Sequence, residues 1–521
     1  MKKSNIILFF VLGLMFLPWL GECLFNTKGE PREAIVAVSM LDSGNWILPE
    51  SYGQDIPYKP PMLAWLISLC SLIFNGGHVN EFTSRLPSAL SAIFLLIAGY
   101  RLLLPRVGRT HAWLVTLITA TSVEFFRASV ACRVDMVLTA AIVGGIYALY
   151  RMRDKPWNIL WAILLLTVAT LTKGPVGSLL PCLAMGIYFL LRGDNFWRTL
   201  TSLTAICVAS FILPALWYYA AWKQGGDGFI ALALEENIGR LTGTMSYESH
   251  TNPWWYNILT VLAGMMPWTI LVVVGLCYRR LRNTIREIKL DRGLPLMSWT
   301  VALTVFIFYC IPESKRSVYL LPCYPFMAYG TAWIIDHMRE TRFMRVMANF
   351  LAVLAVVVPV GLIATAIVAG NSLRLEVMPW WRWPFAAVPV LAGLWWLGTR
   401  NRTSNPVAGV VLIVYVLLFG YNSAFAPMFL NPKSDKPAAE KIAERVESSD
   451  IIYSIIPDSS LNRYYAINFY LNDRMRRIDT VSKAPAGSWI VAPTLPEGFD
   501  GDTLKMRSCC MKQPVILFRK K

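Results

Sequence analysis

The stretch from Asn26 to Leu66 reads NTKGEPREAIVAVSMLDSGNWILPESYGQDIPYKPPMLAWL, and the interpretation of the whole chain starts from it. It follows the first hydrophobic segment and precedes the next strongly hydrophobic one. Its charged residues stand among apolar ones: Glu30, Arg32, Glu33, Asp42, Asp55 and Lys59. Unpaired charge beside a membrane is costly and is usually retained for function. We therefore expect this loop to carry the active site.

The composition is typical of a membrane protein. Of the 521 residues, 55% are hydrophobic and only 16% are charged, which excludes a soluble globule with an ordinary surface. The net charge of +17 is also typical of nucleic-acid binding. However, the Lys and Arg residues stand in short clusters between apolar runs, as they do in cytoplasmic loops. We expect anionic membrane lipids as partners and no nucleic acid.

The segment from Met1 to Leu20 has two lysines followed by an apolar run, which fits a cleaved signal peptide or a retained first helix. We predict a retained helix because no A-x-A site follows, and Lys2 and Lys3 then place the N-terminus in the cytoplasm. Further apolar runs begin near Leu86, Ala112, Met136, Trp157, Val176, Leu200, Trp255, Leu296, Val318, Val346, Phe385 and Val407. The pattern predicts about thirteen transmembrane helices.

Arginine clusters alternate between the loops and predict the topology. They are Arg101/Arg106/Arg109, Arg151/Arg153, Arg192/Arg198, Arg279/Arg280/Arg282/Arg286, Arg339/Arg342/Arg345 and Arg400/Arg402, all on the side of Lys2. The opposite loops gather charges of both signs, at Arg133 and Asp135, at Lys173, between Lys223 and Trp254, and from Glu313 to Arg316. We therefore expect a multi-pass protein of a bacterial inner membrane, with its site and its C-terminus on the periplasmic face.

The composition changes after Phe419, and we divide the chain into a transmembrane domain, 1–430, with a first periplasmic loop, 24–84, and a periplasmic α/β domain, 431–521. In the latter, Pro437–Glu447 and Asn462–Leu471 are predicted helices, and Ile451–Ile455, Ser488–Ala492 and Val515–Phe518 are predicted strands. Asp500-Gly501-Asp502 is more typical of a turn than of a metal site. The adjacent Cys509 and Cys510 leave a strained vicinal disulfide open.

Motifs for several chemistries are absent from the sequence. It has no G-x-x-x-x-G-K-[ST], no G-x-G-x-x-G after a strand and no H-E-x-x-H, which argues against ATP-driven transport, dinucleotide chemistry and zincin proteolysis. The remaining candidates for a chemical role are the carboxylates and cations that stand beside the bilayer. They suit group transfer from a phosphate-bearing lipid, in which a carboxylate deprotonates an acceptor hydroxyl and cations stabilise the departing phosphate.

Gly29–Pro49, G-E-P-R-E-A-I-V-A-x-S-M-L-D-S-G-N-W-I-L-P, and the I-P-Y-K-P-P that follows resemble the first periplasmic loop of bacterial GT-C glycosyltransferases of the ArnT-type and protein O-mannosyltransferase families. Those enzymes read D-E-x-R-Y-A-E-I-A-R-E-M-L-x-S-G-D-W-I-V-P and then Y-F-E-K-P. Further matches are R-V-D-M at Arg133, T-K-G-P at Thr172, H-T-N-P-W-W-Y at His250 and S-K-R-S-V-Y-L-L-P at Ser314. The resemblance covers most of residues 1–430.

The resemblance implies a GT-C fold with a small extracytoplasmic domain, a polyprenyl-phosphate sugar donor and a lipid, glycan or protein acceptor. Glu30 matches the second acid of the family's pair, whereas Gly29 stands at the first, so the catalytic role falls to Glu30 or Asp135. Lys59 matches the lysine that contacts phosphate, and Tyr319 a tyrosine near the lipid phosphate. Tyr58 replaces the glutamate that, with the histidine matched by His250, can hold a divalent ion. A metal is therefore optional here, and the cofactor is unknown.

The candidate site residues fall into three groups besides the catalytic pair. They are the phosphate-binding Lys59, Tyr319, Lys315, Arg316 and Lys173, the substrate-binding Arg32, Tyr58, Arg85, Glu236 and Arg240, and the metal ligand His250. Each has a simpler interpretation: Glu30 as a helix cap, Asp135 as a partner of Arg133 or Arg127, Lys59 as a snorkelling side chain, and the other cations as lipid headgroup contacts.

Two functions compete at this point. One is a lipid-phosphate-sugar glycosyltransferase, and the other is a flippase or transporter of lipid-linked glycans. Transporters concentrate polar residues near the membrane midplane, often in two repeated halves. Here the charges cluster at the ends of the spans on one side, and no internal repeat is visible, so the sequence favours the enzyme.

Overall fold

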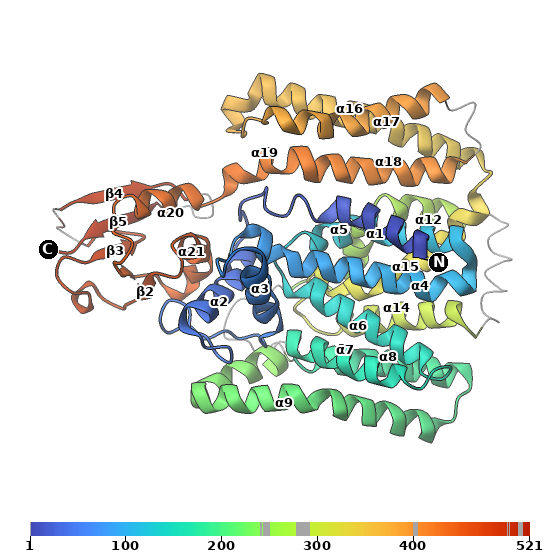
Figure 1. Cartoon of the computed structure of the whole chain (residues 1–521), viewed down its shortest axis with the longest axis horizontal. Coiled ribbons are helices and arrows are strands. Elements are labelled where there is room, and N and C mark those ends of the chain that lie inside the picture. Colours follow the sequence, from blue (N-terminus) through green and yellow to red (C-terminus); the bar gives the residue numbers. More distant parts are fainter. Residues whose placement is uncertain are drawn as a thin grey trace.

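The computed structural model describes residues 2–239, 242, 251–277, 292–399, 405–496, 499, 501–508 and 514–521. Long helices lie side by side in a bundle, and a small domain with a β-sheet projects from one end of it (Figure 1). The helices of the first half are α1 (Lys2–Phe16), α2 (Gly29–Ser43), α3 (Met62–Phe74), α4 (Glu81–Thr121), α5 (Val123–Ser129), α6 (Val134–Arg151), α7 (Asn158–Lys173), α8 (Val176–Arg192), α9 (Phe196–Leu234) and η1 (Glu235–Gly239).

The second half of the bundle begins with a broken helix pair. The helices are α11 (Tyr256–Gly264), α12 (Trp268–Cys277), α14 (Leu294–Cys310), η2 (Ser317–Cys323), α15 (Tyr324–Met338), α16 (Arg342–Leu373), η3 (Trp380–Arg382), α17 (Trp383–Thr399), α18 (Pro406–Gly420), η4 (Tyr421–Phe425), α19 (Ala426–Leu430) and η5 (Asn431–Lys433). The axis bends by 106° between α11 and α12.

The bundle is a multi-pass membrane structure. Within the described residues, six helices are long and apolar enough to cross a membrane, or seven if the bent α11–α12 pair is one span. In α9 with η1 and in α16, only 28% and 22% of the most apolar window is buried, so apolar side chains cover the outside of the bundle, as lipid contact requires. The number of thirteen spans stays a prediction.

The first loop folds into two helices at the end of the bundle that bears the small domain (Figure 1). Helix α2 starts at Gly29 and ends at Gly44, whose φ of 69° is a left-handed conformation that glycine adopts without strain. Helix α3 starts at Met62, directly after Pro60 and Pro61, where the prolines predict a helix start. The two spans expected near Leu86 and Ala112 form one element, α4, which is interrupted at Gly108.

The C-terminal domain has a five-stranded sheet in the order β2-β1-β3-β5-β4. The elements are α20 (Lys436–Ala443), β1 (Ile452–Ser454), α21 (Asp458–Tyr470), β2 (Met475–Arg477), η6 (Val481–Lys483), β3 (Trp489–Ala492), β4 (Thr503–Met506) and β5 (Val515–Arg519). Strands β2, β1 and β3 are parallel, with Ile452 opposite Met475 and Trp489, and β5 joins β3 and β4 in antiparallel fashion. The three predicted strands are present. Strands β2 and β4 escaped prediction because MRR and TLKM are short and charged.

The domain is attached to the first loop through Asp473, which is buried. Its Oδ1 accepts hydrogen bonds from Tyr52 N (2.9 Å) and Asn468 Nδ2 (2.7 Å), and its Oδ2 accepts one from Ser39 Oγ (2.8 Å). An ion pair between Arg477 and Asp55 adds a second contact, with an N–O distance of 2.9 Å. The domain and the loop therefore form one continuous structure.

Replacing Asp473 should loosen this attachment. In Asp473→Ala, Tyr52 N and Ser39 Oγ lose a buried acceptor, and each unsatisfied buried group costs about 1–3 kcal/mol. We expect a lower Tm in detergent and faster proteolytic cleavage of the loop 44–61. The matched control is Asp479→Ala, which removes an exposed aspartate of the same domain that pairs with the exposed Lys483. Equal melting and cleavage in both variants would show that Asp473 does not join the two parts.

Candidate active site

Two adjoining cavities lie between the first loop and the ends of the bundle helices. The inner cavity, with an empty volume of about 470 Å³, is lined by Arg32, Glu33, Tyr58, Lys59, Arg133, Val134, Asp135, Lys173, Arg316 and Tyr319. The outer cavity, of about 660 Å³, shares Arg32, Glu33, Tyr58, Lys59 and Val134 with it. Trp217 of α9 and Tyr465 of α21 also line the outer cavity, so the C-terminal domain contributes to its wall.

Element ends bring the residues of the inner cavity together. Arg32 and Glu33 come from the first turns of α2, and Tyr58 and Lys59 from the segment before α3. Asp135 lies in the first turn of α6 and Lys173 in the last turn of α7, where the helix dipoles favour an acid and a base respectively. The cavity therefore collects charge at one end of the bundle, where predicted outer loops meet.

Each carboxylate of the inner cavity is paired with a lysine. Glu33 Oε1 accepts hydrogen bonds from Lys59 Nζ and from Arg32 Nη2, the latter at 3.1 Å. Asp135 Oδ1 accepts one from Lys173 Nζ at 2.8 Å. Both pairs are largely shielded, with side-chain exposures of 21% and 11% for Lys59 and Glu33. Such pairing offsets part of the cost of removing these charges from water.

The inner cavity has an excess of positive charge. Five cationic side chains line it, against the two carboxylates of Glu33 and Asp135. Within the part of the chain that the structure describes, the guanidinium groups of Arg133 and Arg316 have no carboxylate partner. Guanidinium and ammonium groups converging on a shielded cavity are a typical binding site for a phosphate.

Aromatic rings stand beside the cations. The Nζ of Lys173 lies 4.1 Å from the ring centroid of Tyr319. The Arg32 guanidinium and the Lys59 Nζ lie 5.1 and 5.3 Å from the centroid of Tyr58. These cation–π contacts fix the long side chains without neutralising their charge.

Burial and neighbouring charges shift the pKa values of Glu33 and Lys59. Burial lowers the pKa of Lys59 to about 8, although Glu33 favours its charged form. Burial alone would raise the pKa of Glu33, but the neighbouring Lys59 and Arg32 hold it below its ordinary value. Glu33 is therefore ionised at neutral pH, and Lys59 is charged below a pH of about 8.

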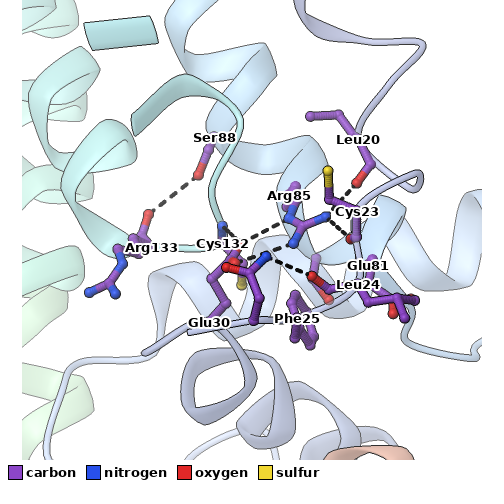
Figure 2. A network of polar contacts seen from close by, with 12 residues as sticks. Leu20, Cys23, Leu24, Phe25, Glu30, Glu81, Arg85, Ser88, Cys132 and Arg133 are labelled. Carbon is purple, nitrogen blue, oxygen red and sulfur yellow. Dashed lines mark hydrogen bonds and ion pairs between the residues drawn. The ribbon is translucent and has the colours of Figure 1, made fainter. Parts of the chain in front are cut away.

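Glu30 lies outside both cavities, in a network at the joint between the first loop and the bundle (Figure 2). Its Oε1 accepts hydrogen bonds from Arg85 Nε (2.8 Å) and Cys132 N (2.9 Å), and its Oε2 accepts one from Arg85 Nη2 (3.2 Å). Arg85 also donates to the carbonyls of Leu20 and Cys23. Burial opposes ionisation of Glu30, but Arg85 and Cys132 N hold its pKa below the ordinary value. Glu30 and Asp135, the two acids to which the sequence analysis gives the catalytic role, therefore do not line one cavity: Asp135 lines the inner cavity and Glu30 does not. The carboxylate beside Asp135 is Glu33.

The other predicted site residues also fall into two groups, those that line the inner cavity and those that do not. Arg32, Tyr58, Lys59, Lys173, Arg316 and Tyr319 line the inner cavity, whereas Arg85 is held by Glu30. Lys315 is buried, and its Nζ donates to the carbonyls of Pro312 (2.6 Å) and Asn252 (3.2 Å) instead of facing the cavity. Glu236 lies in η1 and is not among the described residues that line either cavity. Arg240 and His250 lie outside the described residues.

The residues around Tyr58 do not favour a metal. Arg32 and Lys59 flank its ring, so a cation placed there would meet two positive charges. Within the described ranges, no three His, Cys, Asp or Glu side chains are grouped as metal ligands would be.

Comparisons with known proteins agree with this architecture. The sequence model of the family described as dolichyl-phosphate-mannose-protein mannosyltransferase matches residues 58–219. An undecaprenyl phosphate-α-4-amino-4-deoxy-L-arabinose arabinosyl transferase of Proteus mirabilis is 28% identical over 73% of this chain and 68% of its own length. An uncharacterised Aquifex aeolicus protein is 28% identical over 64% of each chain, so the match spans less than two thirds of that relative.

Two solved structures share the fold. ArnT from Cupriavidus metallidurans bound to undecaprenyl phosphate aligns with a TM-score of 0.73, at 18% identity, over 99% of this chain and 98% of that one. The oligosaccharyltransferase AglB from Archaeoglobus fulgidus aligns with a TM-score of 0.53, at 11% identity, over 94% and 69%. The fold is thus that of a polytopic membrane glycosyltransferase. The sequence relatives and the shared fold support a GT-C glycosyltransferase and favour the transferase over the flippase.

The Glu30–Arg85 pair should be structural. Removing one partner of a buried ion pair leaves an uncompensated charge and costs about 3–5 kcal/mol. We expect Arg85→Ala to lower the Tm in detergent and the yield in the membrane. The control is Arg445→Ala, which breaks the solvent-exposed pair with Asp502 and should cost about 0–1 kcal/mol. A Tm of Arg85→Ala equal to that of the control would contradict this role.

Proposed function

We propose that this protein transfers a sugar from a polyprenyl-phosphate donor, such as an undecaprenyl-phosphate sugar, to a lipid A, surface-glycan or protein acceptor outside the cytoplasm. The observation that carries the proposal is the inner cavity, in which five cationic side chains gather beside two carboxylates at the end of the bundle. The C-terminal domain covers the same end and leaves the helices free to contact lipid.

The cations of the inner cavity suit the phosphate of the donor. Lys59, Lys173, Arg133 and Arg316 line one space, so an anionic phosphate there can contact several of them. Preorganised donors of this kind stabilise the charge that develops on a leaving phosphate, and they act strongly where water is excluded. The same residues thus bind the donor and promote departure of the polyprenyl phosphate. The Tyr319 ring, beside Lys173, borders this space.

The reaction is a single displacement. The acceptor oxygen forms a bond to the anomeric carbon while the bond from that carbon to the phosphate oxygen breaks, and its electron pair leaves with the polyprenyl phosphate. A carboxylate takes the proton of the acceptor hydroxyl. One displacement inverts the anomeric configuration. Asp135 and Glu33 are the carboxylates that line the inner cavity.

The topology is part of the proposal. The alternating arginine clusters support a cytoplasmic N-terminus and a periplasmic C-terminal domain in a bacterial inner membrane. A periplasmic site takes its donor from the outer leaflet of that membrane. This requirement agrees with the position of the first loop, whose residues line both cavities and whose helices α2 and α3 lie at the same end of the bundle as the C-terminal domain (Figure 1).

The direct test is to incubate the purified protein with undecaprenyl-phosphate aminoarabinose and lipid A, and to detect undecaprenyl phosphate and glycosylated lipid A by mass spectrometry. Lipid A and surface glycans from cells with and without the gene identify the native acceptor. A flippase would move the intact donor across a vesicle bilayer without cleaving it. Transport without cleavage would therefore refute the proposal.

Lys59 should be needed for catalysis. Lys59→Ala removes a shielded charge-assisted contact to the phosphate, for which a loss of about tenfold to a thousandfold in kcat is the expected scale. Lys28→Ala is the matched control, because Lys28 is an exposed lysine of the same loop. Equal turnover of the two variants would move the phosphate site toward Lys173 and Arg316.

Donor binding should depend on pH through Lys59. Its pKa of about 8 makes it charged below that pH and neutral above it. Because the second pKa of a phosphate monoester is about 6, undecaprenyl phosphate keeps its charge over this range. We expect the Kd of undecaprenyl phosphate to rise as the pH increases through about 8. In Lys59→Arg the guanidinium stays charged, so this rise should disappear. A Kd rise that persists in Lys59→Arg would assign the titration to another group.

A further inference from the structure

We propose that Glu33 is the general base of the transfer, and that the catalytic acid of the first loop has moved by one helical turn, from position 29 to position 33. This inference rests on the proposed function. It departs from the sequence-based assignment to Glu30 or Asp135 and from the superfamily pattern, in which the acids stand at positions 29 and 30. Four observations, taken in turn, carry it.

The first observation is that position 29 carries no acid and that the end of the Arg133 side chain lies beside it. A Cβ atom built on Gly29 would lie 2.5 Å from Nη2 and 2.7 Å from Cζ of Arg133, closer than such atoms approach. The guanidinium of Arg133 thus occupies the space where the first acid of the superfamily would begin. It also lines the inner cavity, so this part of the cavity wall is cationic in this chain.

The second observation concerns the faces of α2. Residues four apart lie on one face of a helix, so the side chain of Glu33 projects from the same face as position 29. Glu33 lines both cavities and stands where they meet. Glu30 projects from another face, toward Arg85 and Cys132 (Figure 2). Of the two glutamates, only Glu33 borders the cavities.

The third observation is an exchange of residue types. The superfamily pattern has Tyr at position 33, in D-E-x-R-Y, and Glu at position 58, in E-K-P. This chain has Glu33 and Tyr58, so the acid and the ring have changed places. The exchange preserves the contacts of the lysine, because Glu33 accepts a hydrogen bond from Lys59 while the ring of Tyr58 packs beside it. A carboxylate therefore remains next to Lys59, but it now comes from α2.

The fourth observation is the position of Glu33 between the cavities. The inner cavity holds the cations suited to the phosphate, and the outer cavity offers Tyr58, Trp217 and Tyr465 as rings against which a sugar or an acceptor can pack. A base that serves a displacement must reach the acceptor hydroxyl, on the side of the anomeric carbon away from the phosphate. Glu33 stands at that boundary, whereas Asp135 lines the inner cavity and not the outer one.

The contacts of Glu33 also make the basicity of its carboxylate depend on donor binding. Its Oε1 accepts hydrogen bonds from Lys59 and Arg32. A donor phosphate that takes Lys59 as a partner weakens this hold, so Glu33 becomes a stronger base once the donor is bound. It then accepts the proton of the acceptor hydroxyl as the new bond to the anomeric carbon forms and the polyprenyl phosphate departs. Asp135 remains paired with Lys173 and positions that lysine.

The test compares Glu33→Gln, Glu30→Gln and Asp42→Asn, the last being the matched control, since Asp42 is an exposed carboxylate on the same helix. The probes are undecaprenyl-phosphate aminoarabinose with lipid A for turnover, and undecaprenyl phosphate alone for binding. Glu33→Gln should lower kcat by about 10²- to 10⁴-fold, the usual contribution of a positioned base, while undecaprenyl phosphate still binds. The acid limb of the kcat/KM profile should vanish in this variant. Asp42→Asn should behave as the wild type.

Each outcome decides between the alternatives. A Glu33→Gln enzyme that binds undecaprenyl phosphate and turns over at the wild-type rate overturns the inference, as does loss of kcat confined to Glu30→Gln. If Glu33→Gln folds poorly, Glu33→Asp provides the same test, because a shortened base should lower kcat and preserve the acid limb. Wild-type protein that turns over no polyprenyl-phosphate sugar refutes the proposed function itself, whereas normal wild-type turnover with an active Glu33→Gln refutes only the role of Glu33.

Discussion

The buried pair of Glu30 and Arg85 is the contact on which the site depends. Arg85 lies in the first turns of α4, and its guanidinium binds the carboxylate of Glu30 on α2 and the carbonyls of Leu20 and Cys23. Cys132, next to the start of α6, adds its backbone N–H to the same carboxylate. One network thus joins the end of the first hydrophobic segment, the first loop and two bundle helices. Because it fixes the rotation of α2, it also decides which side chains of that helix face the cavities.

The sequence predicts which residues belong to the site better than it predicts which way their side chains point. Lys59, Asp135 and Lys173 are recognisable because each stands in a predicted outer loop beside the membrane, and the structure brings them into one cavity. The stretch Lys315-Arg316 is different, since two adjacent cations point in different directions and hydropathy does not reveal which one enters the cavity. Lys315 turns to backbone carbonyls, and Arg316 lines the cavity.

The choice between Glu30 and Glu33 shows the same limit. They are three residues apart on one helix, and each has charged neighbours in sequence. Only the partners supplied by distant segments separate them, namely Arg85 for Glu30 and Lys59 for Glu33. Tyr465 could not be assigned to the site either, because it belongs to a helix of another domain more than 400 positions from the loop that it faces. One signal in the sequence concerns Glu33: it stands on α2 four residues after Gly29, which occupies the position of the superfamily's first acid.

Paired charges explain how this cluster of buried side chains is tolerated. Unpaired lysines and carboxylates in a shielded cavity would pay a large desolvation cost, and each lysine is paired with a carboxylate. Arg133 and Arg316 are left to attract the anion, and guanidinium groups tolerate this role because they are weakly hydrated and stay charged. A phosphate that enters near them competes with Glu33 for Lys59. The ion pair that offsets the desolvation of Lys59 and Glu33 therefore also restrains the proposed base until a phosphate takes Lys59 as its partner.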